Sequence, residues 1–248
     1  MTIKQWGKVD NSATQLKAQL RIRNLPKAPA VLDLFCGAGQ MHQLAYRGRA
    51  EAYHGIDKEK IHDPAICTLG DNLKYLQKND IDQFNVFDLD DYGCPWKQLY
   101  LILRKLNRPD VTIFVTDGLV MRQKVNGKIS KFVSATERVR RTANIPGLNR
   151  WYVDIFATML LDVEKRYGWK TVKAEYFHND RRSVYYWALK MEKLTAAGKS
   201  ATSKSQKSPS SQRFPAGKTS KAAEKNKKAT KAKKARDMGV SSDQEVPF

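Results

Sequence analysis

Apolar residues along the chain recur in two patterns. Short apolar runs alternate with longer segments in which an apolar residue returns every three or four positions. The first pattern is typical of buried strands and the second of amphipathic helices. The sequence predicts strands at residues 31–35, 52–56, 66–69, 84–89, 111–116, 170–177 and 183–191. It predicts helices at residues 12–22, 39–47, 58–62, 72–78, 96–106 and 150–167.

The order of these elements predicts an α/β fold. Strands that alternate with helices favour a parallel, doubly wound sheet whose ligands bind at the carboxyl ends of the strands. The last two strands, however, are separated only by the turn Asn179–Arg182. Because so short a connection cannot form a right-handed crossover, the last strand is expected to run antiparallel.

Composition divides the chain into three parts. Residues 1–29 form a polar lead-in with one helix, and residues 30–191 form the α/β domain. Residues 192–248 contain 14 Lys and Arg against five acidic residues and almost no aromatic ones. Such a segment buries too little apolar area to offset its chain entropy, so we expect a disordered Lys-rich tail.

The charge of the chain indicates a polyanionic partner. The 248 residues carry a formal net charge of +20 and a sequence pI of about 9.9. Nucleic acid is the first candidate and an anionic membrane surface the second. No apolar run reaches the roughly 20 residues needed to span a bilayer, and the N-terminus lacks a secretory signal, so we expect a cytoplasmic protein, or a nuclear one in a eukaryote. The cluster Lys225–Arg236 is interpreted as a non-specific nucleic-acid tether, with a nuclear-targeting signal as the alternative.

A glycine turn follows the first predicted strand of the domain. The apolar run Val31–Phe35 leads into Gly37 and Gly39, and a helical pattern comes next. Glycines without a Cβ let the main chain approach a ligand, and a helix N-terminus offers unpaired N–H groups. Asp57 lies at the end of the second strand, where an acid can bind the hydroxyls of a ribose. A tight turn without a ligand is the alternative.

An acidic corner follows the strand 84–89. Asp88, Asp90 and Asp91 stand close together, followed directly by Tyr92 and Gly93. Three acids with few compensating cations nearby in the sequence are costly unless they are exposed or engaged, so the cluster indicates a site.

These motifs, in this order and with a terminal hairpin, resemble the seven-stranded fold of class I S-adenosylmethionine-dependent methyltransferases. The resemblance covers residues 31–191 and implies S-adenosylmethionine as cofactor. The cofactor-binding residues that it implies are Asp33, Phe35, Gly37, Gly39, Asp57, Asp71, Asn72 and Asp88. For Asp33 the alternative is a strand-end turn or a helix cap, and Asp71 has the alternative of capping the helix that begins at Asn72.

The acidic corner resembles the Asp-Leu-Asp-Pro-Tyr-Gly-Ser-Pro motif of the tRNA guanine dimethyltransferase family. Here Asp91 replaces the proline and Cys94 the serine. The resemblance implies that Asp90 and the backbone at Asp91 orient the target amine and that Tyr92 stacks on the base. That family is larger, with a further C-terminal domain for which this sequence has no visible counterpart.

Two further stretches bear on the substrate. The connection 118–150 is long and rich in Lys and Arg, and we interpret it as a lid that contacts phosphates through Arg138, Arg140 and Arg141, the alternative being a solvated charged helix face. Cys94 precedes a proline, whereas cytosine-C5 methyltransferases place their nucleophile after one, so a half-buried thiol is the favoured interpretation.

The sequence therefore predicts an enzyme that methylates an exocyclic amine of a nucleic-acid base, with RNA resembling tRNA ahead of DNA. The histidines form no spaced ligand set, and this chemistry needs no metal. The alternatives are a DNA base methyltransferase, a non-catalytic nucleic-acid-binding protein with the same fold, and a methyltransferase for small molecules or proteins.

Overall fold

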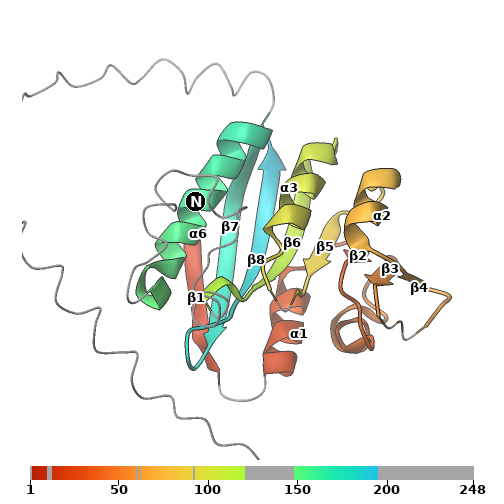
Figure 1. Cartoon of the computed structure of the whole chain (residues 1–248), viewed down its shortest axis with the longest axis horizontal. Coiled ribbons are helices and arrows are strands. Elements are labelled where there is room, and N and C mark those ends of the chain that lie inside the picture. The colour runs from red at the N-terminus through yellow and green to blue at the C-terminus, as the bar shows by residue number, and fades with distance from the viewer. Residues whose placement is uncertain are drawn as a thin grey trace, which may run out of the picture. The chain divides into compact units, whose positions relative to one another are not determined.

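A mixed sheet with helices on both faces forms the framework of the molecule (Figure 1). The computed structural model describes residues 2–9, 13–59, 61, 63–91, 93–120 and 148–194. For residues 2–9 and 148–150 only the backbone is described, except that the side chain of Ile3 is described as well. The strands are β1 (Thr2–Val9), β2 (Ala30–Asp33), β3 (Ala52–Asp57), β4 (Cys67–Leu69), β5 (Val86–Leu89), β6 (Asp110–Asp117), β7 (Trp169–Asn179) and β8 (Tyr185–Lys193). The helices are α1 (Ala13–Asn24), η1 (His42–Tyr46), α2 (Asn72–Lys78), α3 (Trp96–Lys105) and α6 (Leu148–Tyr167).

The strand order confirms the predicted fold class. The order in space is β1-β7-β8-β6-β5-β2-β3-β4. Counted from β2, the seven strands stand in the order 3-2-1-4-5-7-6. All the strand pairs are parallel except those of β8, which runs antiparallel to both β6 and β7, as the short turn before it required.

The N-terminal lead-in was predicted only in part. The predicted helix is present as α1, but residues Thr2–Val9 form an eighth strand that pairs in parallel with β7. Pairing at a sheet edge is made by backbone N–H and C=O groups, which place few demands on side chains. The polar sequence of this segment therefore gave no strand signal.

The two faces of the sheet carry different helices. Helices α2, α3 and α6 pack on one face around a cluster that includes Trp96, Phe156 and Trp187, all fully buried. Helix α1 and η1 pack on the other face around Leu20, Tyr46 and neighbouring apolar residues. This second layer lies against the strands β2 and β5 that carry the predicted site motifs, so α1 is close to them.

Two predicted helices differ from those observed. Lys58, Glu59 and Ile61 are not helical, because the Glu59 N–H donates to Asp57 Oδ1 at 2.8 Å and closes a turn after β3. The helix predicted at 39–47 begins near Gln40 and continues as the π-helical turn η1, in which the Arg47 N–H donates to the His42 carbonyl at 2.7 Å.

Helix α1 is anchored to the sheet through Glu175 of β7. This buried carboxylate accepts from Arg23 Nη2 at 2.7 Å and from Asn24 Nδ2 at 3.0 Å, and it pairs with Lys173 Nζ at 2.8 Å. Burial alone would raise the pKa of Glu175, but these three donors outweigh it and lower the pKa to about 2. The folded state therefore binds this proton less readily than the unfolded chain does.

Replacing Glu175 by glutamine is expected to lower the free energy of unfolding at pH 7 by about 1–3 kcal/mol. Since the folded pKa is depressed, the contribution of Glu175 is fully present above its ordinary pKa of 4.5 and is lost as the pH falls toward about 2. Urea unfolding of wild type and Glu175→Gln at pH 7, 4 and 3 should therefore show that the difference between their free energies of unfolding decreases as the pH falls. The exposed Glu192→Gln serves as control, and a difference of constant size at all three pH values would contradict the assignment.

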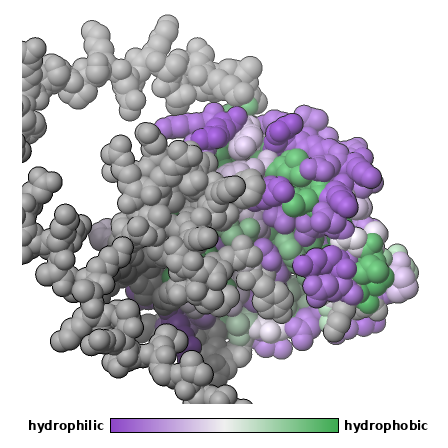
Figure 2. Space-filling model, viewed as in Figure 1, coloured by the Kyte–Doolittle hydropathy of each residue, from purple (hydrophilic) through white to green (hydrophobic). Residues whose placement is uncertain are grey.

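The surface of the described part is mostly hydrophilic. On the face shown in Figure 2, purple residues separate smaller apolar areas. Large apolar side chains that are exposed are Ile22, Leu69, Trp151, Leu161 and Val172. Within the described residues, no helix combines the length and the apolar character that crossing a bilayer requires.

Candidate functional site

A cavity of about 770 Å³ opens at the carboxyl ends of β2, β3, β4 and β5. In doubly wound folds this edge of the sheet is where ligands bind, and the volume lies in the range of small-molecule and cofactor sites. Its walls are formed by Lys17, Leu34, Phe35, Cys36, Gly37, Ala38, Gln40, Met41, Asp57, Lys58, Glu59, Asp71, Asn72, Leu73, Asp90, Asp91 and Gln98. The glycine turn and the acidic corner, about 50 residues apart in the sequence, thus border the same space.

The turn after β2 depends on its glycines. Gly37 has φ +47° and Gly39 has φ +75°, in the left-handed region that side chains with a Cβ rarely adopt. Gly37 lines the cavity, whereas Gly39 closes the turn by donating its N–H to the Cys36 carbonyl at 2.8 Å. The backbone is thereby exposed to the cavity at Gly37, with no side chain in the way.

Asp57 lies opposite this turn, at the end of β3. Its Oδ2 accepts from the Gly37 N–H at 3.1 Å and its Oδ1 accepts from the Glu59 N–H at 2.8 Å. These two bonds fix the direction of the carboxylate at the rim of the turn. The structure therefore places Asp57 in the cavity wall, and the ribose contact remains a prediction.

Asp71 and Asn72 line the cavity at the start of α2. Asp71 caps this helix by accepting from the Lys74 N–H at 2.8 Å. Asn72 donates to the Leu34 carbonyl at 2.9 Å and accepts from Gln98 Nε2 at 3.2 Å, which connects the loop after β2 to α3. The alternative role of Asp71 as a helix cap is thus observed, while its adenine contact stays a prediction.

Asp90 lies at the carboxyl end of β5, where cations surround it. Lys17 Nζ forms an ion pair with it, Arg21 Nη2 lies 3.7 Å from its Oδ2, and Thr116 Oγ1 donates to its Oδ1 at 2.6 Å. Burial would raise the pKa of Asp90, but the charges of Arg21 and Lys17 outweigh burial and hold the pKa below its ordinary value. Asp90 is therefore ionised at neutral pH and can only accept hydrogen bonds. Asp91 lines the same cavity beside it.

Asp33 and Asp88, two of the predicted cofactor-binding residues, lie behind the cavity and are not part of its wall. Asp88 is fully buried and accepts from Arg21 Nε at 2.5 Å, from Arg21 Nη2 at 2.6 Å and from the Tyr46 hydroxyl at 2.5 Å. Asp33 accepts from the Phe35 N–H at 3.1 Å and the Tyr53 hydroxyl at 3.0 Å. The side chains of Asp33 and Asp88 thus bind protein groups, and their contact with a cofactor remains a prediction.

The environment of Asp33 differs from that of the other acids. Burial and the neighbouring Asp88 carboxylate raise the pKa of Asp33 to about 8. Asp33 is therefore mostly protonated at pH 7. Because it is then neutral, Asp33 and Asp88 can lie close together below the glycine turn without repulsion between two negative charges. Its observed hydrogen bond to the Phe35 N–H is the strand-end turn that the sequence left as an alternative.

Other predicted residues lie elsewhere. Tyr92 and the basic residues Arg138, Arg140 and Arg141 are outside the described residues. Cys94 is half-buried and is not part of the cavity wall, in agreement with a packing role. Cys36 does line the cavity, but burial raises the pKa of its thiol, which keeps it protonated.

Sequence reasoning missed Lys17 and Gln98, which also line the cavity. A signal for Lys17 exists. Lys17 and Arg21 stand four residues apart on one helix face, and Asp90, directly after the end of β5, follows Asp88 by two positions. Both spacings are close to 6–7 Å, so a helix with two cations matches a strand with two acids.

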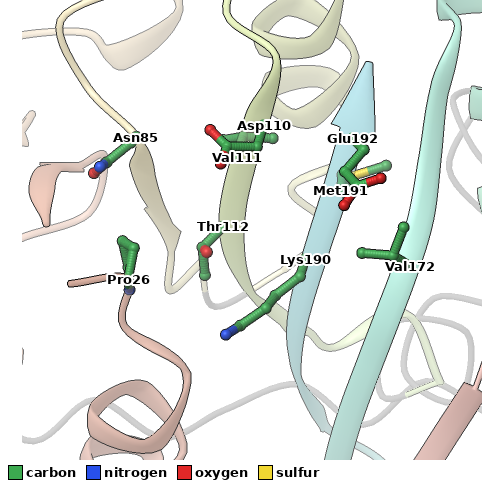
Figure 3. A pocket seen from close by; sticks show the side chains of 9 residues that line it. All are labelled: Pro26, Asn85, Asp110, Val111, Thr112, Val172, Lys190, Met191 and Glu192. Atoms are coloured by element: carbon green, nitrogen blue, oxygen red, sulfur yellow. The ribbon is translucent and has the colours of Figure 1, made fainter. Parts of the chain in front are cut away.

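A second cavity, of about 190 Å³, lies at the other ends of the strands, where β5 and β6 begin (Figure 3). Its wall includes Asn85 before β5, Asp110 at the start of β6 and Glu192 near the end of β8. None of the predicted site residues lines it. Among the described residues, no cluster of three His, Cys, Asp or Glu side chains is arranged to hold a metal ion.

Comparison with known proteins gives similarity of structure alone. No protein-family model matches the chain, and no curated protein sequence does. Among solved structures, the chain is similar to a putative hemolysin from Lactococcus lactis (10% identity, 76% of this chain and 92% of that chain, TM-score 0.48). It is also similar to 1,6-didemethyltoxoflavin-N1-methyltransferase from Burkholderia thailandensis (11%, 75% and 80%, 0.46) and to an O-methyltransferase from Bacillus cereus (14%, 75% and 82%, 0.45), both solved with S-adenosylhomocysteine. Similarity at this level does not identify an activity, so an assignment of function has to be argued from the geometry of the cavity.

Proposed function

We propose that the chain is an S-adenosylmethionine-dependent methyltransferase that acts on an exocyclic amine of a nucleic-acid base, with RNA favoured over DNA. One observation carries this proposal. The glycine turn at Gly37 and the acidic corner at Asp90 and Asp91 line a single cavity at the carboxyl edge of the sheet. A donor held at the turn and an amine held at the corner would share one cavity.

The wall of the cavity fits the proposed cofactor chemically. Asp57 offers a carboxylate to the hydroxyls of a ribose, and Asp71 offers one to an adenine amino group. Leu34, Phe35 and Leu73 supply apolar surface for a flat ring. When bound, S-adenosylmethionine supplies an electrophilic methyl group on a sulfonium.

The acidic corner suits an amine that is a weak nucleophile. The nitrogen lone pair of an exocyclic amine is delocalised into the base, so catalysis depends on orienting that lone pair and on stabilising the positive charge that develops on the nitrogen. Asp90 is ionised and fixed by Lys17 and Thr116, and it can accept an N–H of such an amine. The nearby Asp91 provides a further acceptor from the same loop.

The choice of nucleic acid as substrate is supported by charge and by motif. The net charge of +20 favours a polyanion, and residues 88–95 resemble the motif of enzymes that methylate guanine in tRNA. The cavity wall itself contains five acids and two lysines, so phosphates would be bound outside it. A base that is paired in a duplex would have to be flipped out to enter.

Replacing Asp57 by asparagine is expected to weaken S-adenosylmethionine binding by about 10–100-fold, the loss of one charge-assisted hydrogen bond to the ribose. Isothermal titration calorimetry measures this directly. Asp80→Asn is the matched control, because Asp80 Oδ1 also accepts an N–H two residues on, at 3.0 Å, but lies outside the cavity wall. Equal affinities for the two variants would contradict the assignment of the cavity.

The substrate is tested by offering the protein unmodified tRNA transcripts, duplex DNA and single-stranded DNA with deuterated S-adenosylmethionine. Mass spectrometry of the digested nucleosides should show label on an exocyclic amine, in RNA before DNA. Label on a ring carbon would refute the proposed chemistry. Cofactor binding without label in any polynucleotide would favour a small-molecule or protein substrate, and no cofactor binding would favour a non-catalytic protein.

A further inference from the structure

The N-terminal helix α1, which lies outside the seven-stranded core, places two cations next to the acids at the end of β5. Arg21 and Lys17 both face the sheet, one turn of helix apart, and both approach acids at the carboxyl end of β5. The rise between residues four apart on a helix is about 6 Å, close to the 6.6 Å between residues two apart on a strand. The two cations of one helix can therefore pair with both carboxylates and compensate their negative charges.

The two ion pairs lie at different depths. Arg21 and Asp88 are 2% and 0% exposed, and their two-point contact lies behind the cavity. Lys17 and Asp90 have side chains that are 18% and 14% exposed, and both line the cavity. The inner pair is thus a structural anchor, whereas the outer pair is accessible to a ligand.

The contacts of Asp90 also restrict its orientation. Thr116 on β6 donates to Oδ1, while Lys17 on α1 pairs with Oδ2. Two partners on opposite oxygens, from two different elements, hold the plane of the carboxylate. Of roughly four acceptor positions on an ionised carboxylate, these two partners occupy two.

We propose that Lys17 is a positioning residue for Asp90, fixing the direction and the charge of the carboxylate that receives the target amine. This proposal rests on the proposed function for the identity of the amine, but the contact itself does not depend on it. Lys17 acts through Asp90 and need not touch the substrate.

The groups that face Asp90 come from several elements. Among the residues that the structure describes, the cations near it are Lys17 and Arg21 of α1, and Asp88 of β5 lies two positions before it. Asp91 is adjacent, Thr116 of β6 donates to it, and the pKa of Tyr186 of β8 is raised to about 12 by burial and by the Asp90 charge. A cation within about 4–6 Å lowers a carboxyl pKa by about 1–3 units in general. Loss of Lys17 leaves the Arg21 charge and the Thr116 hydrogen bond to oppose burial, so the pKa of Asp90 should rise.

The test is a carboxyl-carbon NMR titration of the full-length protein labelled at aspartate, with the Asp90 signal assigned by its absence in Asp90→Asn. Lys17→Met should move the Asp90 titration to higher pH, and Lys17→Arg, which keeps the charge, should restore most of the shift. Arg23→Met is the matched control, because Arg23 is a cation of the same helix that binds Glu175 and not Asp90. An unchanged Asp90 titration in Lys17→Met, or an equal shift in Arg23→Met, would overturn the proposal. If Lys17→Met did not fold, Lys17→Gln would be titrated in its place and judged in the same way.

A second readout connects the contact to catalysis. With the RNA that wild type labels, Lys17→Met should lower kcat by about tenfold or more and move the acid limb of the kcat profile to higher pH, with S-adenosylmethionine affinity changed by less than about threefold. If wild type labels no polynucleotide, the proposed function fails while the NMR titration still decides the role of Lys17. If wild type is active and Lys17→Met has wild-type kcat at every pH, the positioning role is refuted.

Discussion

Replacing Arg21 by methionine is expected to lower the free energy of unfolding by about 3–5 kcal/mol, the cost of leaving a buried charge without its partner. Arg21 makes a two-point contact with Asp88, and both side chains are almost completely inaccessible to solvent. Methionine keeps much of the apolar stem but removes the charge. Urea unfolding at pH 7 measures the loss, and in a domain of this size it should be visible as a large shift of the midpoint.

Two further variants test whether the loss of stability comes from the buried ion pair. Arg104→Met removes a cation from an exposed position of α3 and should cost less than about 0.5 kcal/mol. In the Arg21→Met background, Asp88→Asn should recover part of the lost stability, because it removes the unpaired negative charge while the Tyr46 contact can persist. If Arg21→Met lowered the free energy of unfolding no more than Arg104→Met does, the buried Asp88 carboxylate would not need Arg21 to compensate its charge.

Replacing Asp90 by asparagine is expected to reduce kcat for methyl transfer by about 100-fold or more, since a neutral amide neither orients an amine as firmly nor receives its developing charge. The amide oxygen can still accept from Thr116, so the loop should keep its shape. Asp57 lies two strands away, a distance of about 10 Å, and S-adenosylmethionine affinity should therefore change by less than about threefold.

Radiolabelled methyl transfer to the RNA that wild type accepts measures this effect, together with calorimetry for the cofactor. Asp63→Asn is the control, because Asp63 accepts the Ala65 N–H at 2.9 Å and does not itself line the cavity. Wild-type kcat in Asp90→Asn would remove Asp90 from the mechanism, and an equal loss of cofactor affinity would indicate a role in holding the donor instead.

Much of the fold was accessible to pattern analysis because local periodicity reports burial. All seven strands predicted from apolar runs are present within a few residues, and the short turn at Asn179–Arg182 correctly implied an antiparallel last strand. The glycine turn and Asp57 were found because their backbone and charge requirements are local. Most of the predicted acids, glycines and amides that lie in the described part indeed border one cavity.

What pattern analysis missed lies in contacts between distant segments. Asp33 and Asp88 were assigned to the cofactor on the basis of motif position, and the sequence did not indicate that Tyr53, Tyr46 and Arg21 bind them from other elements. Strand β1 was missed because its pairing with β7 uses backbone groups. No window of sequence contains both members of such a pair.

The sequence by itself determined the order and type of most elements, the glycine turn and the presence of acids at the ends of several strands. Only the tertiary structure decided which acid faces the cavity and which is buried behind it, and it brought Lys17 and Arg21 of α1 onto those acids. The physical reason is that backbone preference and burial period act over a few residues, whereas the ionisation and direction of a carboxylate depend on charges that packing delivers from about 70 positions away.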